Sequence, residues 1–226
     1  MNFELTLTQK KEIASSIYQF WFKNSGQNVE FRAGQFLKWR LNHSNPDNRG
    51  IDRFFTIASS PTEDGILLAT KIFDKSSTFK KSLKNLEIGD KIMAEGPYGE
   101  FTLSEEEMGR DIFIAGGIGI TPFRSIIKYL LDTKKRRDIF QIYGVKSADE
   151  IVFEDIFEAG ENELGIKTIY EIGHIDKKII TKHIREISGF SFYLSGPEKM
   201  VDITADILIS LGAEQAKIKR DYFPGY

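Results

Sequence analysis

The sequence predicts two domains, an antiparallel β-barrel followed by an α/β domain with a doubly wound parallel sheet. Up to about residue 104, short apolar strands are separated by turn residues, which is typical of a small barrel. From Gly109 onward, expected strands alternate with expected helices, as in a parallel sheet covered on both faces. The acidic segment 104–107 separates the two patterns, so we predict domains at residues 1–106 and 107–226.

The first half is expected to hold six strands and one helix. The strands are expected over residues 3–8, 17–22, 35–41, 54–58, 66–72 and 90–95, and the helix over 79–85. In the second half, strands are expected over residues 111–115, 138–143, 166–172, 190–195 and 215–220. Helices are expected over residues 122–132, 149–159, 176–187 and 198–211.

Composition narrows the function classes. A chain of 226 residues with 41% hydrophobic and 28% charged residues can bury a substantial core. A formal net charge of -2 predicts no nucleic-acid binding, and no apolar stretch is long enough to span a bilayer. Residues 1–11 are polar and lack a signal-peptide pattern, so we expect a cytoplasmic protein. The absence of cysteine excludes thiol catalysis and cysteine-ligated metal centres, and the three histidines lack ligand spacing, so no metal site is predicted.

The segment 116–120, Gly-Gly-Ile-Gly-Ile, joins an expected strand to an expected helix. Thr121 is expected to cap that helix, and Pro122 suits its first helical position, where no amide hydrogen is needed. Glycines such as Gly117 and Gly119 let a ligand approach the backbone, and the positive end of the helix dipole favours an anion. The turn predicts a diphosphate site; an ordinary tight strand-to-helix connection is the alternative.

This turn differs from that of an ordinary dinucleotide-binding dehydrogenase. Pro122 replaces the third glycine of the usual fingerprint. The second strand of the domain ends before Lys146 without a carboxylate, and Asp138 lies at its start. A ribose-binding acid is therefore not predicted.

Two segments of the first half combine anion-binding and aromatic residues. Arg53 and Phe55 share one face of an expected strand, and Thr56 follows them. A guanidinium matches a diphosphate, an aromatic ring can stack on a flat ligand, and a threonine can reach a ring nitrogen. Ser77 and Thr78 open a helix and supply a second anion site. A core strand with a solvated arginine, and a simple helix N-cap, are the alternatives.

Together, four motifs in this order resemble the ferredoxin-NADP reductase superfamily, whose members pair an FAD-binding barrel with a nicotinamide-binding α/β domain. The resemblance covers the whole chain. The family's Arg-x-aromatic-Ser/Thr motif matches residues 53–56, its Gly-Pro-x-Gly-x-Phe turn matches 96–101, and its Gly-Gly-x-Gly-x-Thr-Pro matches 116–122. Its Cys-Gly-Pro appears as residues 195–197, Ser-Gly-Pro, so a thiol often found near the nicotinamide is missing.

The resemblance implies FAD and NADH or NADPH as cofactors. It places Arg53 on the FAD diphosphate, Phe55 on the flavin, and Thr56 at the flavin N5 edge. The candidate cofactor-binding residues are Arg53, Phe54, Phe55, Thr56, Thr70, Lys71, Ile72, Ser77, Thr78, Gly117, Gly119, Thr121, Pro122, Lys146, Ser195, Gly196, Pro197, Phe223 and Tyr226. The candidate catalytic residues are Thr56, Asp221 and Phe223.

Two of the C-terminal candidates have open alternatives. Asp221 matches an acidic position that some members of the superfamily place beside the flavin, where it could assist proton balance. A solvated carboxylate at a strand end is the alternative. Phe223, with Tyr226 as second choice, matches an aromatic that covers the flavin; aromatics that seal the domain interface are the alternative.

The implied reaction passes a hydride from NAD(P)H to flavin and then electrons to a separate acceptor, such as ferredoxin, flavodoxin or a small molecule. A free-flavin or ferric reductase, and a non-catalytic FAD- and nucleotide-binding electron-transfer subunit, are the alternatives. An acidic carrier could dock on residues 134–137 or, nearer the flavin, on Lys80, Lys81 and Lys84. We expect modest donor discrimination that leans to NADH, because only Lys146 closes the second strand and residues 171–174 contain no arginine.

Overall fold

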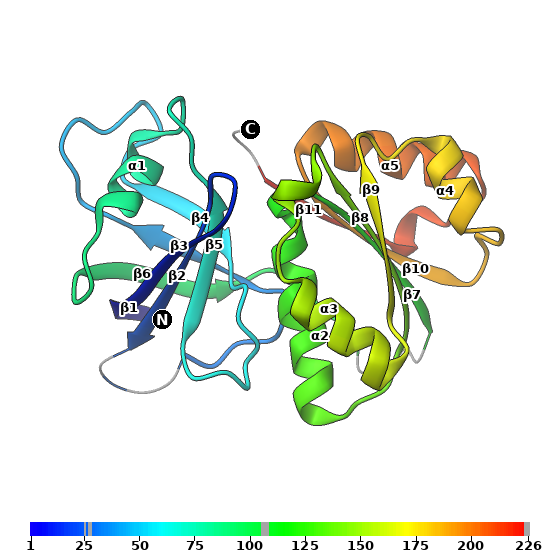
Figure 1. The fold of residues 1–226 in the computed structure, drawn as a ribbon, viewed down its shortest axis with the longest axis horizontal. Helices are drawn as coiled ribbons and strands as arrows, with labels where there is room; N and C mark the ends of the chain where they lie inside the picture. Colours follow the sequence, from blue (N-terminus) through cyan, green and yellow to red (C-terminus); the bar gives the residue numbers. More distant parts are fainter. Residues whose placement is uncertain (25, 27–28, 105–108, 224–226) are drawn as a thin grey trace.

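The computed structural model of the protein describes residues 1–24, 26, 29–104 and 109–223. It contains one antiparallel and one parallel sheet, which lie side by side with helix α2 between them (Figure 1). The predicted fold class is confirmed. The predicted domain boundary, between residues 106 and 107, lies outside the described residues.

The first sheet has six antiparallel strands in the order β4-β3-β6-β1-β2-β5. The strands are β1 (Asn2–Ala14), β2 (Ile17–Asn24), β3 (Phe36–Arg40), β4 (Asp52–Thr56), β5 (Ile66–Lys71) and β6 (Lys91–Tyr98). The backbone N–H of Ala58, just after β4, donates to the Leu67 carbonyl in β5 at 2.8 Å. Because β4 and β5 are the two edges, this contact curls the sheet into a half-barrel. Helix α1 (Thr78–Asn85) buries Phe79 and Leu83 in the barrel core.

The second sheet has five parallel strands in the order β11-β10-β7-β8-β9. The strands are β7 (Arg110–Gly116), β8 (Asp138–Val145), β9 (Lys167–Ile172), β10 (Phe190–Gly196) and β11 (Ile218–Tyr222). The first strand of this sheet, β7, lies in its centre. From β7 the chain runs outward through β8 to β9, and it then returns to β10 on the other side of β7. The strand order therefore reverses between β7 and β10, which is the switch point of a doubly wound sheet.

Helices cover both faces of the parallel sheet (Figure 1). Helices α2 (Thr121–Thr133) and α3 (Glu154–Ala159) pack on the face nearer the barrel, and α4 (Lys177–His183) and α5 (Glu198–Ser210) on the other. Residues of β7 alternate between the two cores: Phe113 packs with α2, and Ile114 packs with α5. The strand periodicity therefore determines both layers.

The segment around α3 differs from the helix expected over residues 149–159. A short turn, η2 (Ala148–Glu150), is followed by an extended stretch, and α3 begins only after Phe153. Phe153 has a φ of 63°, in the left-handed region, and its carbonyl accepts from the Ile156 and Phe157 amides at 3.1 and 3.3 Å. No glycine or proline marks this break, so the sequence pattern did not reveal it. The strand expected over residues 215–220 also begins late, at Ile218.

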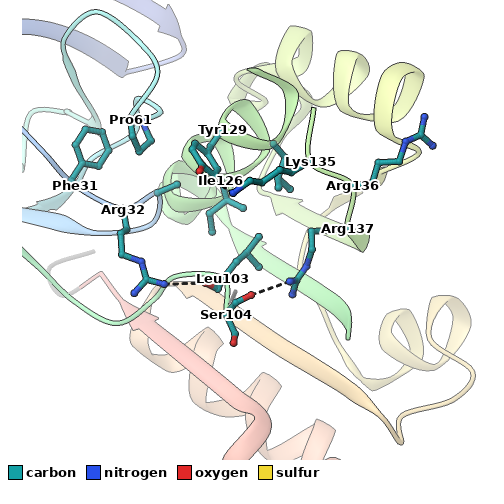
Figure 2. A pocket seen from close by; sticks show the side chains of 12 residues that line it. Phe31, Arg32, Pro61, Leu103, Ser104, Ile126, Tyr129, Lys135, Arg136 and Arg137 are labelled. Atoms are coloured by element: carbon teal, nitrogen blue, oxygen red, sulfur yellow. Dashed lines mark hydrogen bonds between the residues drawn. The ribbon is translucent and has the colours of Figure 1, made fainter. Parts of the chain in front are cut away.

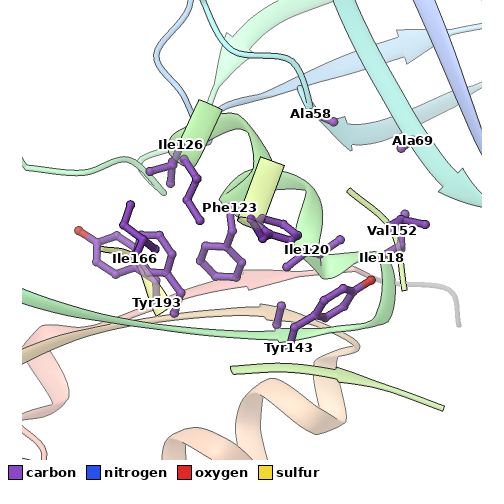
Figure 3. Packing of buried hydrophobic residues seen from close by; sticks show 14 of the residues in the cluster. Ala58, Ala69, Ile118, Ile120, Phe123, Ile126, Tyr143, Val152, Ile166 and Tyr193 are labelled. Atoms are coloured by element: carbon purple, nitrogen blue, oxygen red, sulfur yellow. The ribbon is translucent and has the colours of Figure 1, made fainter. Parts of the chain in front are cut away.

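The two halves share an apolar cluster. It joins Ala58 and Ala69 of the barrel half to Phe123 and Ile126 of α2 (Figure 3). Burying this surface contributes to stability and holds α2 against the barrel. Among the described residues, no helix is both long and apolar enough to cross a membrane.

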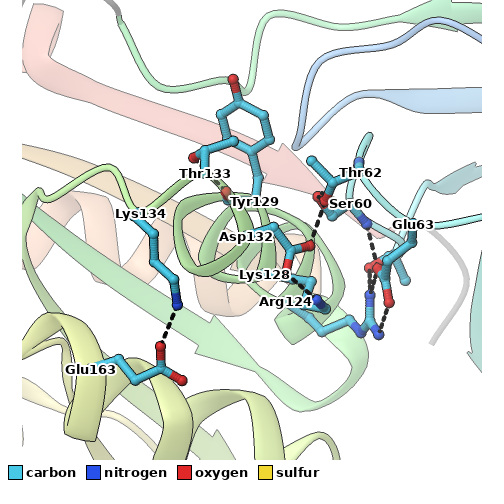
Figure 4. A network of polar contacts seen from close by, with 11 residues as sticks. Ser60, Thr62, Glu63, Arg124, Lys128, Tyr129, Asp132, Thr133, Lys134 and Glu163 are labelled. Atoms are coloured by element: carbon cyan, nitrogen blue, oxygen red, sulfur yellow. Dashed lines mark hydrogen bonds and ion pairs between the residues drawn. The ribbon is translucent and has the colours of Figure 1, made fainter.

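Polar contacts surround this cluster (Figure 4). The Arg124 guanidinium of α2 makes a two-pronged ion pair with Glu63 and donates to the Ala58 carbonyl at 2.9 Å. The Ser125 hydroxyl donates to the Ser59 carbonyl at 2.5 Å. Helix α2 therefore carries both the apolar and the polar contacts that fix one half against the other.

Candidate functional site

The switch point of the parallel sheet brings two loops together. β7 ends at Gly116 and the neighbouring β10 ends at Gly196, with Ala115 paired to Ser195. Ligands of open α/β sheets bind outside the carboxyl ends of the strands at such a point. The glycine turn after β7 and residues 195–197 therefore form the walls of the candidate nicotinamide site.

Two glycines of the turn have different surroundings. A Cβ on Gly119 would lie 2.4 Å from the Ser195 carbonyl oxygen and 2.6 Å from Gly196 Cα, so the turn packs directly on the β10 loop. Gly117 has a φ of +54°, and a Cβ there would meet nothing within 4 Å. Gly119 is thus required for packing, whereas Gly117 is the position that a nucleotide could approach.

The start of α2 corrects one expectation. A 3-10 turn, η1 (Gly117–Ile120), precedes α2, and the helix begins one residue earlier than predicted, so Pro122 is its second residue. Thr121 does not cap the helix, because it is itself the first residue of α2 and Ile120 takes the N-cap position. Its hydroxyl donates back to the Ile118 carbonyl at 3.1 Å. Thr121 is only 1% exposed. Its contact with a cofactor, like that of Pro122, stays a prediction.

Lys146 is exposed directly after β8, and Pro197 precedes α5 at the end of the β10 loop. Both positions lie at the carboxyl edge of the sheet, where the nucleotide is expected. Their roles in binding remain predictions.

Ser195 and Asp221 form a polar pair in this region. The strands β10 and β11 place them opposite each other, and the Ser195 hydroxyl donates to Asp221 Oδ2 at 3.1 Å. Burial raises the pKa of Asp221 to about 7, while the hydrogen bond from Ser195 opposes the shift. A carboxyl group that titrates near neutral pH can hold or release a proton at this position.

Replacing Asp221 with asparagine is expected to stabilise the protein more at about pH 8 than at about pH 5. An unfolded aspartate has a pKa of about 3.9, so the folded state with a pKa of about 7 loses stability as the pH rises between these values. Asparagine avoids that loss. Urea unfolding at both pH values measures the difference, with Asp206→Asn as an exposed control. Equal effects at both pH values contradict the raised pKa.

Phe223 follows β11, and its amide donates to the Gly196 carbonyl at 2.9 Å. Its ring packs at the edge of the apolar cluster shared by the two halves. This contact is consistent with sealing of the interface and leaves the flavin-covering role as a prediction. Tyr226 lies outside the described residues.

On the barrel side, Arg53 is held rigidly at the start of β4. Its Nη1 donates to the carbonyls of Arg49, Gly50 and Asp52 at 3.0, 3.1 and 2.6 Å. The guanidinium lies 5.4 Å from the centre of the Phe79 ring, and its side chain is 11% exposed. These contacts fix the guanidinium beside the first turn of α1.

The rest of the β4 motif alternates as expected for a strand. Phe55 is buried against Phe79, with ring centroids 5.9 Å apart, and Thr56 is buried. Phe54 points the other way, is 63% exposed, and packs edge-on against Phe36. Arg53 and Phe55 therefore share a face, as predicted, although Phe55 turns its ring toward the barrel core. The contacts of Phe54, Phe55 and Thr56 with FAD remain predictions.

At the end of β5, Thr70 and Ile72 are buried, and Lys71 lies between them. The Lys71 ammonium pairs with Glu150, which belongs to η2 in the other half of the chain. This ion pair crosses the domain interface, a contact that the sequence did not indicate. The predicted contacts of Thr70, Lys71 and Ile72 with flavin remain untested.

The first turn of α1 collects polar side chains from distant segments. The Ser77 hydroxyl accepts from the Lys80 amide at 3.3 Å, as a helix N-cap does. The Thr78 hydroxyl lies 3.0 Å from His43 Nε2 and accepts from the Asp47 amide at 3.0 Å. His43 and Asp47 come from the β3–β4 loop, and sequence reasoning missed both.

Cations gather at the same turn. The Lys80 ammonium donates to the Lys71 carbonyl at 3.2 Å. Burial, and then the nearby charges of Arg49 and Arg53, lower the pKa of Lys80 to about 8. Arg53 Nε is buried without a partner among the described residues. Three neighbouring cations, an unpaired donor and the amides of a helix start fit the diphosphate of FAD.

A separate pocket of about 660 Å3 opens at the amino edge of the parallel sheet (Figure 2). Apolar residues of both halves, such as Phe31 and Leu130, line it together with Arg32 and Lys135. The pocket lies away from the glycine turn and belongs to neither candidate cofactor site.

The basic segment 134–137 is partly engaged within the domain. Lys134 pairs with Glu163 at 2.6 Å, and Arg137 pairs with the buried Asp111 at 2.8 Å. Lys135 and Arg136 are exposed. In the alternative docking group, Lys84 lies 4.6 Å from the centre of the Tyr18 ring.

Comparison with known proteins agrees with both predicted cofactor-binding domains. The family model of the oxidoreductase FAD-binding domain matches residues 4–103, and that of the oxidoreductase NAD-binding domain matches residues 113–206. The chain belongs to the ferredoxin-NADP reductase superfamily. It carries an FAD-binding domain followed by an NAD-binding domain of the oxidoreductase type, as the sequence predicted.

Three similar proteins illustrate this membership. Sulfhydrogenase 2 subunit gamma of Pyrococcus furiosus is 30% identical over 76% of this chain and 60% of its own length. The reductase component of propane 2-monooxygenase of Rhodococcus jostii is 26% identical over 61% of this chain and 42% of its own length. The structure of ferredoxin-NADP+ reductase from Plasmodium falciparum superposes with a TM-score of 0.80 at 20% identity, over 98% of this chain and 96% of that one. The chain thus spans less than two thirds of the length of both curated relatives.

Proposed function

We propose that the protein passes reducing equivalents from NADH or NADPH through FAD to a separate electron acceptor. One observation supports this proposal above all: the same chain has an anion site at Arg53 and α1, and a glycine turn at the switch point of the parallel sheet. Bound FAD would supply the chemistry that links two-electron oxidation of a reduced nicotinamide to one-electron or two-electron transfer to the acceptor. Arg53, Ser77 and Thr78 would hold the diphosphate, and Gly117 would admit the nucleotide.

The residues near Asp221 serve the reaction by position and charge. Ser195 orients the Asp221 carboxyl group, which holds or releases a proton near neutral pH. Thr56, buried at the end of β4, would contact the flavin when FAD is bound. The close contact of Gly119 with the β10 loop keeps the nucleotide site in register with these groups.

A visible spectrum tests this proposal. The purified protein with FAD should be yellow, and anaerobic NADH or NADPH should bleach it. A yellow protein that stays yellow favours a non-catalytic electron-transfer subunit. A protein that leaves the spectrum of added FAD unchanged contradicts the whole proposal.

The acceptor is proposed to be a small redox protein such as ferredoxin or flavodoxin. The chain has no cysteine, so it cannot itself hold a cysteine-ligated iron-sulfur cluster. One relative is named as the reductase component of a monooxygenase, which supports transfer to a separate protein. Another is named as a sulfhydrogenase subunit, which favours the second candidate, an electron-transfer subunit of a larger complex.

Donor discrimination is expected to be modest and to lean to NADH. Lys146 is the exposed cation directly after β8, and a 2'-phosphate usually requires paired donors. Steady-state kinetics with both donors measures the preference. Lys146→Ala should lower kcat/KM for NADPH more than for NADH, and a preference of about a hundredfold for NADPH, about 2.7 kcal/mol, contradicts the prediction.

Phe223→Ser is expected to change the flavin absorbance and to tighten nicotinamide binding. If the ring covers the flavin, the nicotinamide displaces a stacking contact of about 0.5 to 1.5 kcal/mol at each turnover, and serine removes that competition. Absorbance, nucleotide titration and single-turnover rates measure the effect, with Tyr222→Ser as control. Wild-type values in all three measurements assign Phe223 to the interface instead.

A further inference from the structure

The carboxylate of Asp47 occupies the centre of the α1 anion site. Its Oδ1 accepts from Arg53 Nη2 at 2.8 Å and from the Arg49 amide at 3.0 Å. Its Oδ2 accepts from the Thr78 amide at 3.3 Å and lies 3.7 Å from the Arg49 guanidinium. Guanidinium groups and a helix-start amide are the donors that a diphosphate requires.

Asp47 is charged in this position. Burial by itself would raise the pKa of Asp47, but hydrogen bonds from the Arg49 amide and from Arg53 hold this pKa below its usual range. A carboxylate and a diphosphate both need these donors. They cannot use the same Arg53 nitrogen and the same Thr78 amide together at full strength.

The cation is anchored more firmly than the carboxylate. Arg53 lies on strand β4 and three backbone carbonyls hold its Nη1, whereas Asp47 lies in the loop that joins β3 to β4. The Asp47 amide is bound by the Thr78 hydroxyl, which limits how far the loop moves. Exchange of the two anions therefore requires rotation of the Asp47 side chain rather than movement of Arg53.

We propose that the Asp47 carboxylate stands in for the FAD diphosphate in the cofactor-free protein and must leave Arg53 and the Thr78 amide before FAD binds. Asp47 thereby sets the affinity for FAD. The proposal rests on the proposed FAD site. A binding-competent form that is only partly populated lowers the apparent affinity by that fraction, and removing the competing charge restores it.

The test compares Asp47→Asn with wild type. The variant keeps the side-chain shape and an acceptor oxygen but loses the charge. FAD titration of the apoprotein, followed by flavin fluorescence, should give a dissociation constant about tenfold lower. Stopped-flow mixing should give faster FAD binding. The melting temperature of the apoprotein should be lower than that of the wild-type apoprotein, and the increase in melting temperature on FAD binding should be larger than in wild type.

Asp52→Asn is the matched control. Asp52 is a nearby acid that pairs with Arg40 at 2.7 Å and with Lys38 at 3.3 Å. The change of net charge is identical, so an effect of general electrostatics would appear in both variants. The proposal expects FAD affinity within about twofold of wild type in this control.

Arg53→Ala separates failure of this proposal from failure of the FAD site. A dissociation constant raised about tenfold to 150-fold supports the site, because a charge-assisted contact is lost. If Arg53→Ala weakens FAD binding while Asp47→Asn leaves it unchanged or also weakens it, the stand-in role of Asp47 is wrong. If Arg53→Ala has no effect, the FAD site itself is wrong, and the proposal for Asp47 is overturned with it.

Discussion

Arg124→Met should lower the free energy of unfolding by about 3 to 5 kcal/mol, because it breaks a buried ion pair and leaves one charge behind. Arg124 is 6% exposed, and Glu63 and the Ala58 carbonyl receive its donors. The variant retains the apolar stem but leaves the Glu63 carboxylate enclosed without its cation. Loss of the charge also removes contacts with the Trp21 and Phe153 rings, whose centres lie 5.8 and 5.5 Å away.

Thermal and urea unfolding measure this effect. For a chain of this size, about 3 to 5 kcal/mol corresponds to a melting temperature lower by on the order of 10 °C. Arg136→Met, an exposed arginine a few residues after α2, should change stability by less than about 0.5 kcal/mol. The double variant Arg124→Met with Glu63→Gln should recover part of the loss, since no charge is left unpaired. An Arg124 variant as stable as its control would show that the pair does not hold the two halves together.

The sequence could predict those parts of the site that depend on local patterns. Strand alternation placed Arg53 and Phe55 on one face, and a hydroxyl residue before an apolar helix face located the start of α1. The glycine turn was visible because a strand, glycines and a proline follow one another within a few residues. Each inference needed only neighbouring residues, and the structure retains each of these local features.

Contacts between distant segments could not be predicted in this way. His43 and Asp47 meet Thr78 across separations of 35 and 31 residues, and they come from a loop without periodicity. Arg124 and Glu63 are 61 residues apart, and neither occupies a recognisable motif. Nothing in a single sequence specifies which loop packs on which helix, so these polar groups were identified only from the fold.

The cap predicted at Thr121 was wrong for a different reason. The residue type suits a cap, but a 3-10 turn inserted between β7 and α2 places Ile120 at the N-cap position. Thr121 is therefore already helical, and a cap residue must lie outside the helix. The tight packing of the glycine turn on β10 favours the turn, and that packing arises from two strands that are far apart in sequence.

Gly119→Ala is expected to lower the free energy of unfolding by about 3 kcal/mol, at the upper end of the usual cost of overpacking. The added Cβ would lie 2.4 Å from the Ser195 carbonyl oxygen and 2.6 Å from the Gly196 amide nitrogen. Both are backbone atoms, so no side-chain rotation relieves the overlap, and β7 and β10 must separate where they end. FAD affinity should stay within about twofold of wild type, since the proposed FAD site lies in the barrel half.

Substitutions at two further glycines distinguish an effect on packing from an effect on ligand binding. Gly109→Ala is the control for stability, because a Cβ there would meet nothing within 4 Å and its φ is not positive. The methyl group of Gly117→Ala also enters open space, but the φ of Gly117 is +54°, so the substitution should cost about 1 kcal/mol of stability through backbone strain.

The same substitution tests ligand access. If the nucleotide approaches the turn at Gly117, the methyl group of the introduced alanine must weaken NAD(P)H binding by far more than the small loss of stability explains. Calorimetric melting and nucleotide titration of the three variants measure the two effects separately. Wild-type nucleotide binding by Gly117→Ala would move the diphosphate away from this turn, and wild-type stability of Gly119→Ala would show that the turn and the β10 loop are not closely packed.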